Sequence, residues 1–406
     1  MTTAPAPTRT HAPATGLPPV PLLALALLAV TANLRVAMSS LPPLRDTIVA
    51  DLHLSNAAMG ALTTLPVLCM GLFAPAAQRL ARRHGAAAGV QLAILIVLVG
   101  VGSRLWGDTT WVLYAGTFLA GVGIAIGGTL LPGLVKALFP PHRTGLVTGL
   151  YMLAMMGGAA VSSAVSVPLA DRLGSWQGSL ASWSLLAAVG ALAWAPVTVG
   201  SVRHRAANPE VDSGHGLPWR HRTAWLVAAF MALQSWLFYS CLAWVAPSYQ
   251  DHGWDATTTG YLLSVFSGVQ VCSGLLGPLL ADRIHDRRVL LLSASVFGAT
   301  GLLGLAVAPG AAPWLWVALL GMGQGPAFSL GMVLLIDYSR TPQGSGRLAA
   351  MVLFVSYTVA AWGPTTMGAV RDATGSFRSV WVVLLGLAVV QTLLVTRFRR
   401  SLPQTP

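Results

Sequence analysis

Charge is scarce in this chain of 406 residues. Asp, Glu, Lys and Arg together make up 9% of the sequence, whereas hydrophobic residues make up 55%. A water-soluble protein usually has about a quarter of its residues charged, because those residues cover its surface. The composition therefore excludes an ordinary soluble domain and predicts a protein that crosses a membrane many times.

Residues that bind metals or form disulfides are also few. The three cysteines, Cys69, Cys241 and Cys272, stand in separate apolar runs and have neither ligand nor redox spacing. Histidine occurs only in the first residues of the chain and in predicted loops. An enzyme inside the membrane needs convergent His, Asp or Ser groups. We therefore expect no metal, no cofactor and no enzymatic activity.

Twelve apolar runs are long enough to cross a bilayer, which takes roughly 20 residues. Each predicts a helix, because an open strand leaves its backbone groups unsatisfied in lipid. The runs cover 20–41, 55–76, 86–105, 111–134, 146–169, 177–198, 223–247, 257–280, 289–308, 313–336, 348–370 and 379–396. The predicted fold class is an all-α membrane protein of twelve transmembrane helices.

The chain repeats itself at a spacing of about half its length. Gly121 and Gly123 correspond to Gly321 and Gly323 at an offset of 200, and residues 174–176 correspond to 375–377 at an offset of 201. Such matches in corresponding spans indicate a duplication. We predict a disordered tail (1–19), a six-helix bundle (20–198), a cytoplasmic linker (199–222), a second six-helix bundle (223–397) and a C-terminal tail (398–406).

The positive charges predict the orientation. The formal net charge is +12, which alone would suggest nucleic-acid binding. However, 18 of the 24 Lys and Arg residues fall in the two tails and alternate loops. The positive-inside rule places these segments, and both termini, in the cytoplasm of an inner (plasma) membrane protein, and we expect no nucleic-acid partner. The five cations assigned to outer segments are Arg45, Arg104, Arg172, Arg371 and Arg378.

One cation lies well inside the first span. Arg35 stands about 22 Å from the start of its helix, slightly beyond the bilayer midplane. A guanidinium there costs about 2.5–3.5 kcal/mol on insertion scales, so it is usually paired or functional. No Asp or Glu occurs inside any span, and a negative or dipolar solute could supply the missing partner. The competing interpretation is a cation that snorkels outward or locks helices together.

Other polar groups fall at mid-span positions. Asn33 lies on a different face of the first helix from Arg35, which favours a hydrogen bond to a neighbouring helix. By the repeat, its counterpart is Gln234, and Tyr239 and Gln324 lie at similar depth in their spans. For these groups an interhelical hydrogen bond and a contact with a solute remain equally open.

Two loop segments carry a resemblance. AQRLARR (77–83) and ADRIHDRR (281–288) resemble the loop motif of the major facilitator superfamily. Asp282, Arg283, Arg287 and Arg288 match the acid and the cations of that motif. Gln78 replaces the acid in the first copy, and neither copy keeps the motif's glycine. The resemblance implies a two-repeat transporter, and it leaves the motif's conformational role in doubt for the first half.

Longer segments resemble the cyanate and 2-nitroimidazole transporter branch of that superfamily. They are residues 32–44, 62–75, 233–244, 321–328 and 369–377. The resemblance implies a secondary or facilitative transporter of a small anionic or dipolar solute, with the lipid bilayer and that solute as partners. A coupling proton, drug efflux and a membrane sensor stay open as alternatives. The resemblance assigns solute binding to Asn33, Arg35, Gln234, Tyr239, Trp244 and Gln324.

Overall fold

The computed structural model describes residues 18–205, 217–283, 286–340 and 342–398. These residues form α-helices joined by short turns and two short 3₁₀ segments. The elements of the first part of the chain are α1 (Val20–Ser39), η1 (Pro42–Leu44), α2 (Arg45–Leu52), α3 (Asn56–Leu72), α4 (Ala74–His84), α5 (Ala86–Gly102), η2 (Ser103–Trp106), α6 (Thr110–Leu138), α7 (Pro141–Leu173), α8 (Trp176–Ser182) and α9 (Ser184–Arg205). Those of the second part are α10 (Arg222–Gln250), α11 (Ala256–Arg283), α12 (Arg287–Val307), α13 (Pro313–Asp337), α14 (Pro342–Ala360), α15 (Trp362–Thr374) and α16 (Phe377–Val395).

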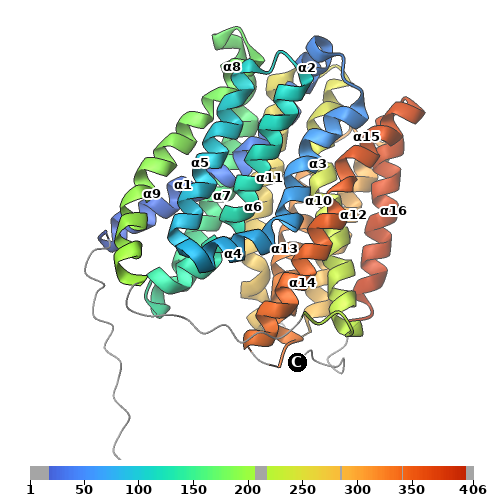
Figure 1. Cartoon of the computed structure of the whole chain (residues 1–406). Helices are drawn as coiled ribbons and strands as arrows, with labels where there is room; N and C mark the ends of the chain where they lie inside the picture. The colour runs from blue at the N-terminus through green and yellow to red at the C-terminus, as the bar shows by residue number, and fades with distance from the viewer. Residues whose placement is uncertain (1–17, 206–216, 284–285, 341, 399–406) are drawn as a thin grey trace, which may run out of the picture.

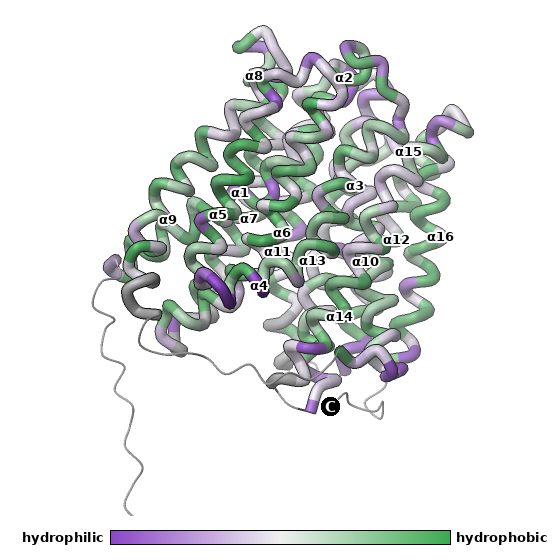
Figure 2. Tube along the Cα trace, in the orientation of Figure 1, coloured by the Kyte–Doolittle hydropathy of each residue, from purple (hydrophilic) through white to green (hydrophobic). Residues whose placement is uncertain are grey.

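The described residues contain 11 helical segments long and apolar enough to cross a membrane, and the bent pair α3 and α4 raises this to 12. Figure 2 shows hydrophobic residues along the middle of the bundle and hydrophilic residues gathered toward its ends. The predicted all-α membrane fold with twelve spans is therefore confirmed.

The second span is bent, which the apolar pattern did not predict. α3 ends at Leu72, and α4 continues at an angle of 52°. Pro75 lies in the first turn of α4, where its missing N–H costs no hydrogen bond. Residues 77–83, predicted as a loop, are therefore helical, and Arg82, Arg83 and His84 occupy the last turn. Cations are favourable at that end of a helix.

The two halves of the chain lie side by side (Figure 1). α1–α9 form the first bundle and α10–α16 the second. α7 packs along α11, and α3 packs along α14 and α15, so these pairs form the two seams between the halves. Each half has its own buried clusters, but Met38 and Val67 of the first half belong to a cluster of the second half. The halves are therefore in direct contact at the level of these residues.

The ends of the two bundles differ slightly from the predicted boundaries. α9 continues to Arg205, beyond the predicted end at residue 198. Phe398, placed in the predicted C-terminal tail, is 2% exposed and packs against the rings of Phe230 and Tyr338. The described part of the second bundle therefore extends through Phe398.

Candidate functional site

Arg35 lies at the contact between the two halves. Its side chain is 8% exposed, and Nη1 donates a hydrogen bond of 3.2 Å to the Tyr239 hydroxyl on α10. The guanidinium carbon also lies 5.1 Å from the ring centroid of Phe238 and 5.4 Å from that of Tyr239. Within the described parts of the chain, no carboxylate lies at ion-pair distance from Arg35. The cation is thus surrounded by neutral groups.

Two further side chains complete the surroundings of Arg35. The Tyr239 hydroxyl lies 3.6 Å from Met70 Sδ on α3. Tyr357 of α14 places its ring centroid 6.4 Å from that of Tyr239, in an edge-on arrangement. The candidate site therefore combines residues of α1, α3, α10 and α14. Phe238 and Met70 were not predicted as site residues, because nothing in the sequence distinguishes them from the other apolar residues of their spans.

Gln234 and Gln324 form a second polar contact, inside the second half. Gln234 Nε2 donates to Gln324 Oε1 at 3.2 Å, and the two side chains are 1% and 4% exposed. This amide pair joins α10 to α13. The structure brings these two predicted residues together, as the interhelical interpretation expects, and their contact with a solute stays a prediction.

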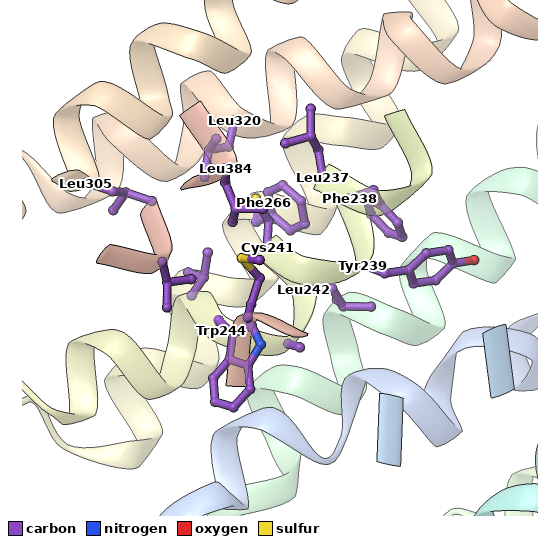
Figure 3. Close-up of a cluster of buried hydrophobic side chains, with 14 of the residues drawn as sticks. Leu237, Phe238, Tyr239, Cys241, Leu242, Trp244, Phe266, Leu305, Leu320 and Leu384 are labelled. Carbon is purple, nitrogen blue, oxygen red and sulfur yellow. The ribbon is translucent and has the colours of Figure 1, made fainter. Parts of the chain in front are cut away.

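Asn33 and Trp244 lie apart from the Arg35 contact. Asn33 Nδ2 donates to the carbonyl oxygen of Leu186 on α9 at 3.2 Å. Trp244 Nε1 donates to the carbonyl oxygen of Pro364 at 2.9 Å, and the indole is 1% exposed. Figure 3 shows Tyr239 and Trp244 pointing in different directions from α10. Asn33 and Trp244 therefore each donate to a backbone carbonyl of a neighbouring helix, and their roles in solute binding remain predictions.

The second copy of the loop motif is partly described. Arg287 Nε donates to Asp337 Oδ2 at 3.2 Å, which joins the start of α12 to the end of α13. Arg288 pairs with Asp286 at 2.8 Å. The side chains of Asp282 and Arg283 lie outside the described residues. The described cations of the motif thus form ion pairs within the second half.

A close contact between α3 and α15 joins the halves at the end of the bundle where α2 and α8 lie (Figure 1). We call it the outer seam, because the charge distribution of the sequence predicts that this end faces outward, and define it by Asn56, Gly60, Thr64, Thr365, Gly368 and Asp372. The carboxylate of Asp372 accepts hydrogen bonds from the backbone N–H of Asn56 at 3.1 Å and of Ala57 at 2.9 Å. These are among the first N–H groups of α3, which have no partner in their own helix and favour a negative charge. The second half therefore caps a helix of the first half.

Small residues allow the outer seam to close. A Cβ added at Gly60 would lie 2.4 Å from the carbonyl oxygen of Pro364, and one at Gly368 would lie 2.4 Å from that of Asn56. Next to them, the hydroxyls of Thr64 and Thr365 are 2.7 Å apart. Backbone therefore packs against backbone here, which is possible only without side chains at these two positions.

One hollow of about 750 Å³ opens at the same end of the bundle. Leu44, Asp51, Val167, Asp171 and Trp176 are among its lining residues, and Trp176 Nε1 donates to Asp51 at 2.9 Å. Ala256, the first residue of α11, also lines it. None of the predicted solute-binding residues contributes to this hollow.

Comparison with known proteins agrees with this architecture. The family described as the Major Facilitator Superfamily matches residues 23–364 and 224–406. An uncharacterized transporter of Bacillus subtilis, YycB, is 37% identical over 88% of this chain and 88% of its own length. The 2-nitroimidazole transporter of Escherichia coli is 32% identical, covering 92% of this chain and 93% of the relative. The cyanate transport protein CynX of the same organism is 30% identical, covering 92% and 95%.

A solved structure supports the fold independently. The crystal structure of a D-xylose–proton symporter superposes with a TM-score of 0.75 and covers 94% of this chain and 99% of the symporter. The two sequences are only 14% identical, so this likeness concerns the fold alone. Together with the family match and the relatives over most of the chain, it confirms the resemblance read from the sequence. The chain belongs to the major facilitator superfamily, in the branch of the cyanate and 2-nitroimidazole transporters.

Proposed function

We propose that this protein carries a small anion or a small, strongly dipolar solute across the membrane by alternating access. Two bundles that rock about a central site expose it to one side of the membrane at a time. Cyanate-like anions and nitroimidazole-like compounds are the solute classes suggested by the relatives. The protein acts in this proposal as a carrier, with no catalytic step and no cofactor.

A single observation supports the anion site most strongly. Arg35 is a cation at the boundary of the two halves, and its described partners are a phenol hydroxyl and two aromatic faces. These partners compensate a buried charge only in part, because a cation–π contact contributes about 0.5–2 kcal/mol and one hydrogen bond of a charged group about 1.5–3 kcal/mol. An anion placed against the guanidinium would supply the missing charge with two aligned hydrogen bonds.

The same geometry couples the solute to the movement of the halves. Arg35 belongs to α1 of the first half, and Tyr239 to α10 of the second. A solute that accepts a hydrogen bond from both would hold the two halves together while it is bound. The outer seam would then close over the solute, and its opening would release the solute to the outer side.

A purely structural role of Arg35 is the second candidate, favoured by its hydrogen bond to Tyr239 across the halves. In that case Arg35 is a lock between α1 and α10, and the solute binds elsewhere. Drug efflux is a third possibility for the same fold, favoured by the aromatic and thioether groups near the site, Phe238, Tyr357 and Met70. The efflux alternative predicts that small anions do not compete for transport, and the lock alternative predicts that Arg35→Ala and Tyr239→Phe lose transport equally.

We further propose that both termini face the cytoplasm of the inner membrane. Arg82 and Arg83 occupy the last turn of α4, and Arg397 follows the end of α16. The C-terminal end of α16 lies opposite α2 and α8 (Figure 1). This asymmetry follows the positive-inside rule.

The acids of the sequence stand at the ends of the predicted spans or outside them, so their positions do not assign a proton-coupling residue. Exchange, facilitated diffusion and co-transport of a proton all fit this arrangement.

A flux screen tests the proposal. The purified protein is reconstituted in proteoliposomes, and uptake of labelled cyanate is measured with unlabelled nitrite, 2-nitroimidazole and ethidium as competitors. We expect saturable cyanate uptake that nitrite and 2-nitroimidazole inhibit and ethidium does not. Inhibition by ethidium alone would favour the efflux of bulky aromatic compounds. Cyanate uptake equal to that of empty liposomes would contradict the proposed anion transport.

The Gln234–Gln324 pair gives a second test. Replacing Gln234 with alanine removes the amide that donates to Gln324 Oε1, so the Gln324 side chain on α13 becomes less ordered. We expect the apparent KM for cyanate to rise about three- to tenfold, as expected for the loss of one neutral hydrogen bond. The amount of folded protein in the membrane should fall by less than this. A large loss of folded protein with an unchanged KM would assign Gln234 to helix packing.

A further inference from the structure

Arg104 is a second cation inside the first half, although the sequence places it in an outer loop. It belongs to η2, the short 3₁₀ turn after α5, and its side chain is 0% exposed. The turn directs the side chain between α1 and α6. Gly100 and Gly116 make this possible, because α5 and α6 approach so closely that a Cβ at Gly100 would lie 2.4 Å from the backbone nitrogen of Ala120.

The partners of Arg104 leave its charge uncompensated. Nη2 donates to the carbonyl oxygen of Ala37 at 3.0 Å and to Thr117 Oγ1 at 3.3 Å. Nε and Nη1 are buried and have no hydrogen-bond partner. Among the described residues, no carboxylate lies at ion-pair distance from Arg104. A buried charge without a counter-charge is costly, so packing alone is a poor reason for a guanidinium at this position.

The contact with Ala37 connects Arg104 to the proposed solute site. Ala37 follows Arg35 by two residues on α1, a rise of about 3 Å. Its carbonyl is one of the last four of α1, which have no partner in their own helix and favour a cation nearby. Arg104 therefore holds the end of the helix that carries Arg35. Arg104 reaches α1 from the side of α6, whereas Arg35 contacts α10. The diameter of a helix with its side chains, about 10–12 Å, therefore separates the charge of Arg104 from an anion bound at Arg35.

We infer that Arg104 is a positioning and specificity residue of the Arg35 site, whose buried charge favours an anionic over a neutral solute. This inference rests on the proposed function. At about 10 Å and an effective dielectric constant of about 20, one unit charge changes the affinity for an anion roughly tenfold. A neutral solute gains nothing from this interaction. The two unpaired cations, Arg35 and Arg104, thus set a positive potential along the outer half of α1.

Charge-changing and charge-preserving variants of Arg104 test the inference. Arg104→Gln and Arg104→Met remove the charge, the second without burying a new polar group, and Arg104→Lys keeps the charge. We expect the apparent KM for cyanate to rise about tenfold in the two uncharged variants and to stay within about twofold of wild type in Arg104→Lys. The maximal rate per folded protein should change less than the KM. Thr117→Val removes a neutral partner of Arg104 and should leave the KM unchanged.

A neutral solute separates charge from structure. Uptake or competition by 1-methyl-2-nitroimidazole, which has no ionisable N–H, should be the same in wild type and in the uncharged variants. A KM for cyanate within twofold of wild type in Arg104→Gln or Arg104→Met would overturn the inference. So would an equal rise in Arg104→Lys, because it would indicate a role in shape alone. If wild type itself takes up no anion, the proposed function fails first, and the two failures are thus distinguishable.

Discussion

Replacing Arg35 with alanine is expected to lower the initial rate of cyanate uptake into proteoliposomes about a hundredfold or more. The change removes the unpaired cation at the boundary of the halves, together with its hydrogen bond to Tyr239. Hydrogen bonds from a charged group contribute about 1.5–3 kcal/mol each, so the loss of one or two of them accounts for a factor of this size. The amount of protein inserted in the membrane should remain near that of wild type, because alanine is favourable both in helices and in lipid.

Arg35→Lys distinguishes charge from geometry. Lysine keeps the positive charge but lacks the planar fork that binds an anion with two parallel hydrogen bonds. We expect a reduction of about tenfold, between wild type and Arg35→Ala. Arg378→Ala is the matched control, since it removes an exposed arginine from the first turn of α16 and should leave uptake unchanged. Normal uptake in Arg35→Ala would remove the anion site from the proposal.

Tyr239→Phe then separates binding from locking. It removes the hydroxyl that accepts from Arg35 but keeps the aromatic ring. If the solute is the main partner of Arg35, Tyr239→Phe should retain more uptake than Arg35→Ala. If Arg35 is only a lock between the halves, the two variants should lose uptake to the same extent.

Much of the helical architecture could be predicted from the sequence, because a segment that crosses the bilayer must satisfy its own backbone hydrogen bonds. An apolar run of bilayer length has no stable alternative to a helix, and this predicts nearly every span. Arg35 stands out for the same reason, since a cation inside such a run is costly in any fold. Asn33 also behaves as its position on the helix indicates: its amide reaches Leu186 on α9, away from Arg35.

The rest of the site depends on information that an apolar pattern does not hold. When both the lipid-facing and the protein-facing sides of a helix are apolar, the sequence does not fix which side faces the neighbouring helix. Trp244 therefore packs on Pro364 although it shares α10 with Tyr239. Arg104 stands at the end of the predicted span 86–105 and was counted with the outer segments, but the 3₁₀ turn η2 carries its side chain back between the helices. The contact of α3 with α15 depends on how the halves meet, which no local pattern encodes.

That contact leads to the second large effect. Replacing Gly60 with alanine is expected to hold the outer seam open and to reduce uptake more than tenfold. The new Cβ would overlap the carbonyl oxygen of Pro364 at 2.4 Å, and a backbone atom has no rotamer by which to move away. Overpacking of this kind costs about 1–3 kcal/mol, which shifts the equilibrium away from the closed seam by a factor of about 5–150. The fold of each half should be preserved, because the overlap exists only between the halves.

Cysteine labelling measures this shift directly. Thr365, which lies 2.7 Å from Thr64 in the closed seam, is replaced with cysteine in a variant whose three native cysteines are changed to alanine. We expect an impermeant maleimide added from outside to label this position faster when Gly60→Ala is present. Gly386→Ala in α16 is the matched control, because an added Cβ there meets no atom within 4 Å. Lost uptake without faster labelling would assign Gly60 to folding and not to the seam.

Gly368→Ala approaches the same seam from the other half. Its Cβ would lie 2.4 Å from the carbonyl oxygen of Asn56, so it should increase labelling at position 365 as Gly60→Ala does. The double variant is the decisive case. Once one methyl group has separated α3 from α15, the second no longer meets a neighbour. The effect of the double variant on labelling and uptake should therefore be smaller than the sum of the two single effects. Two independent defects within separate bundles would instead add fully, because nothing would connect their costs.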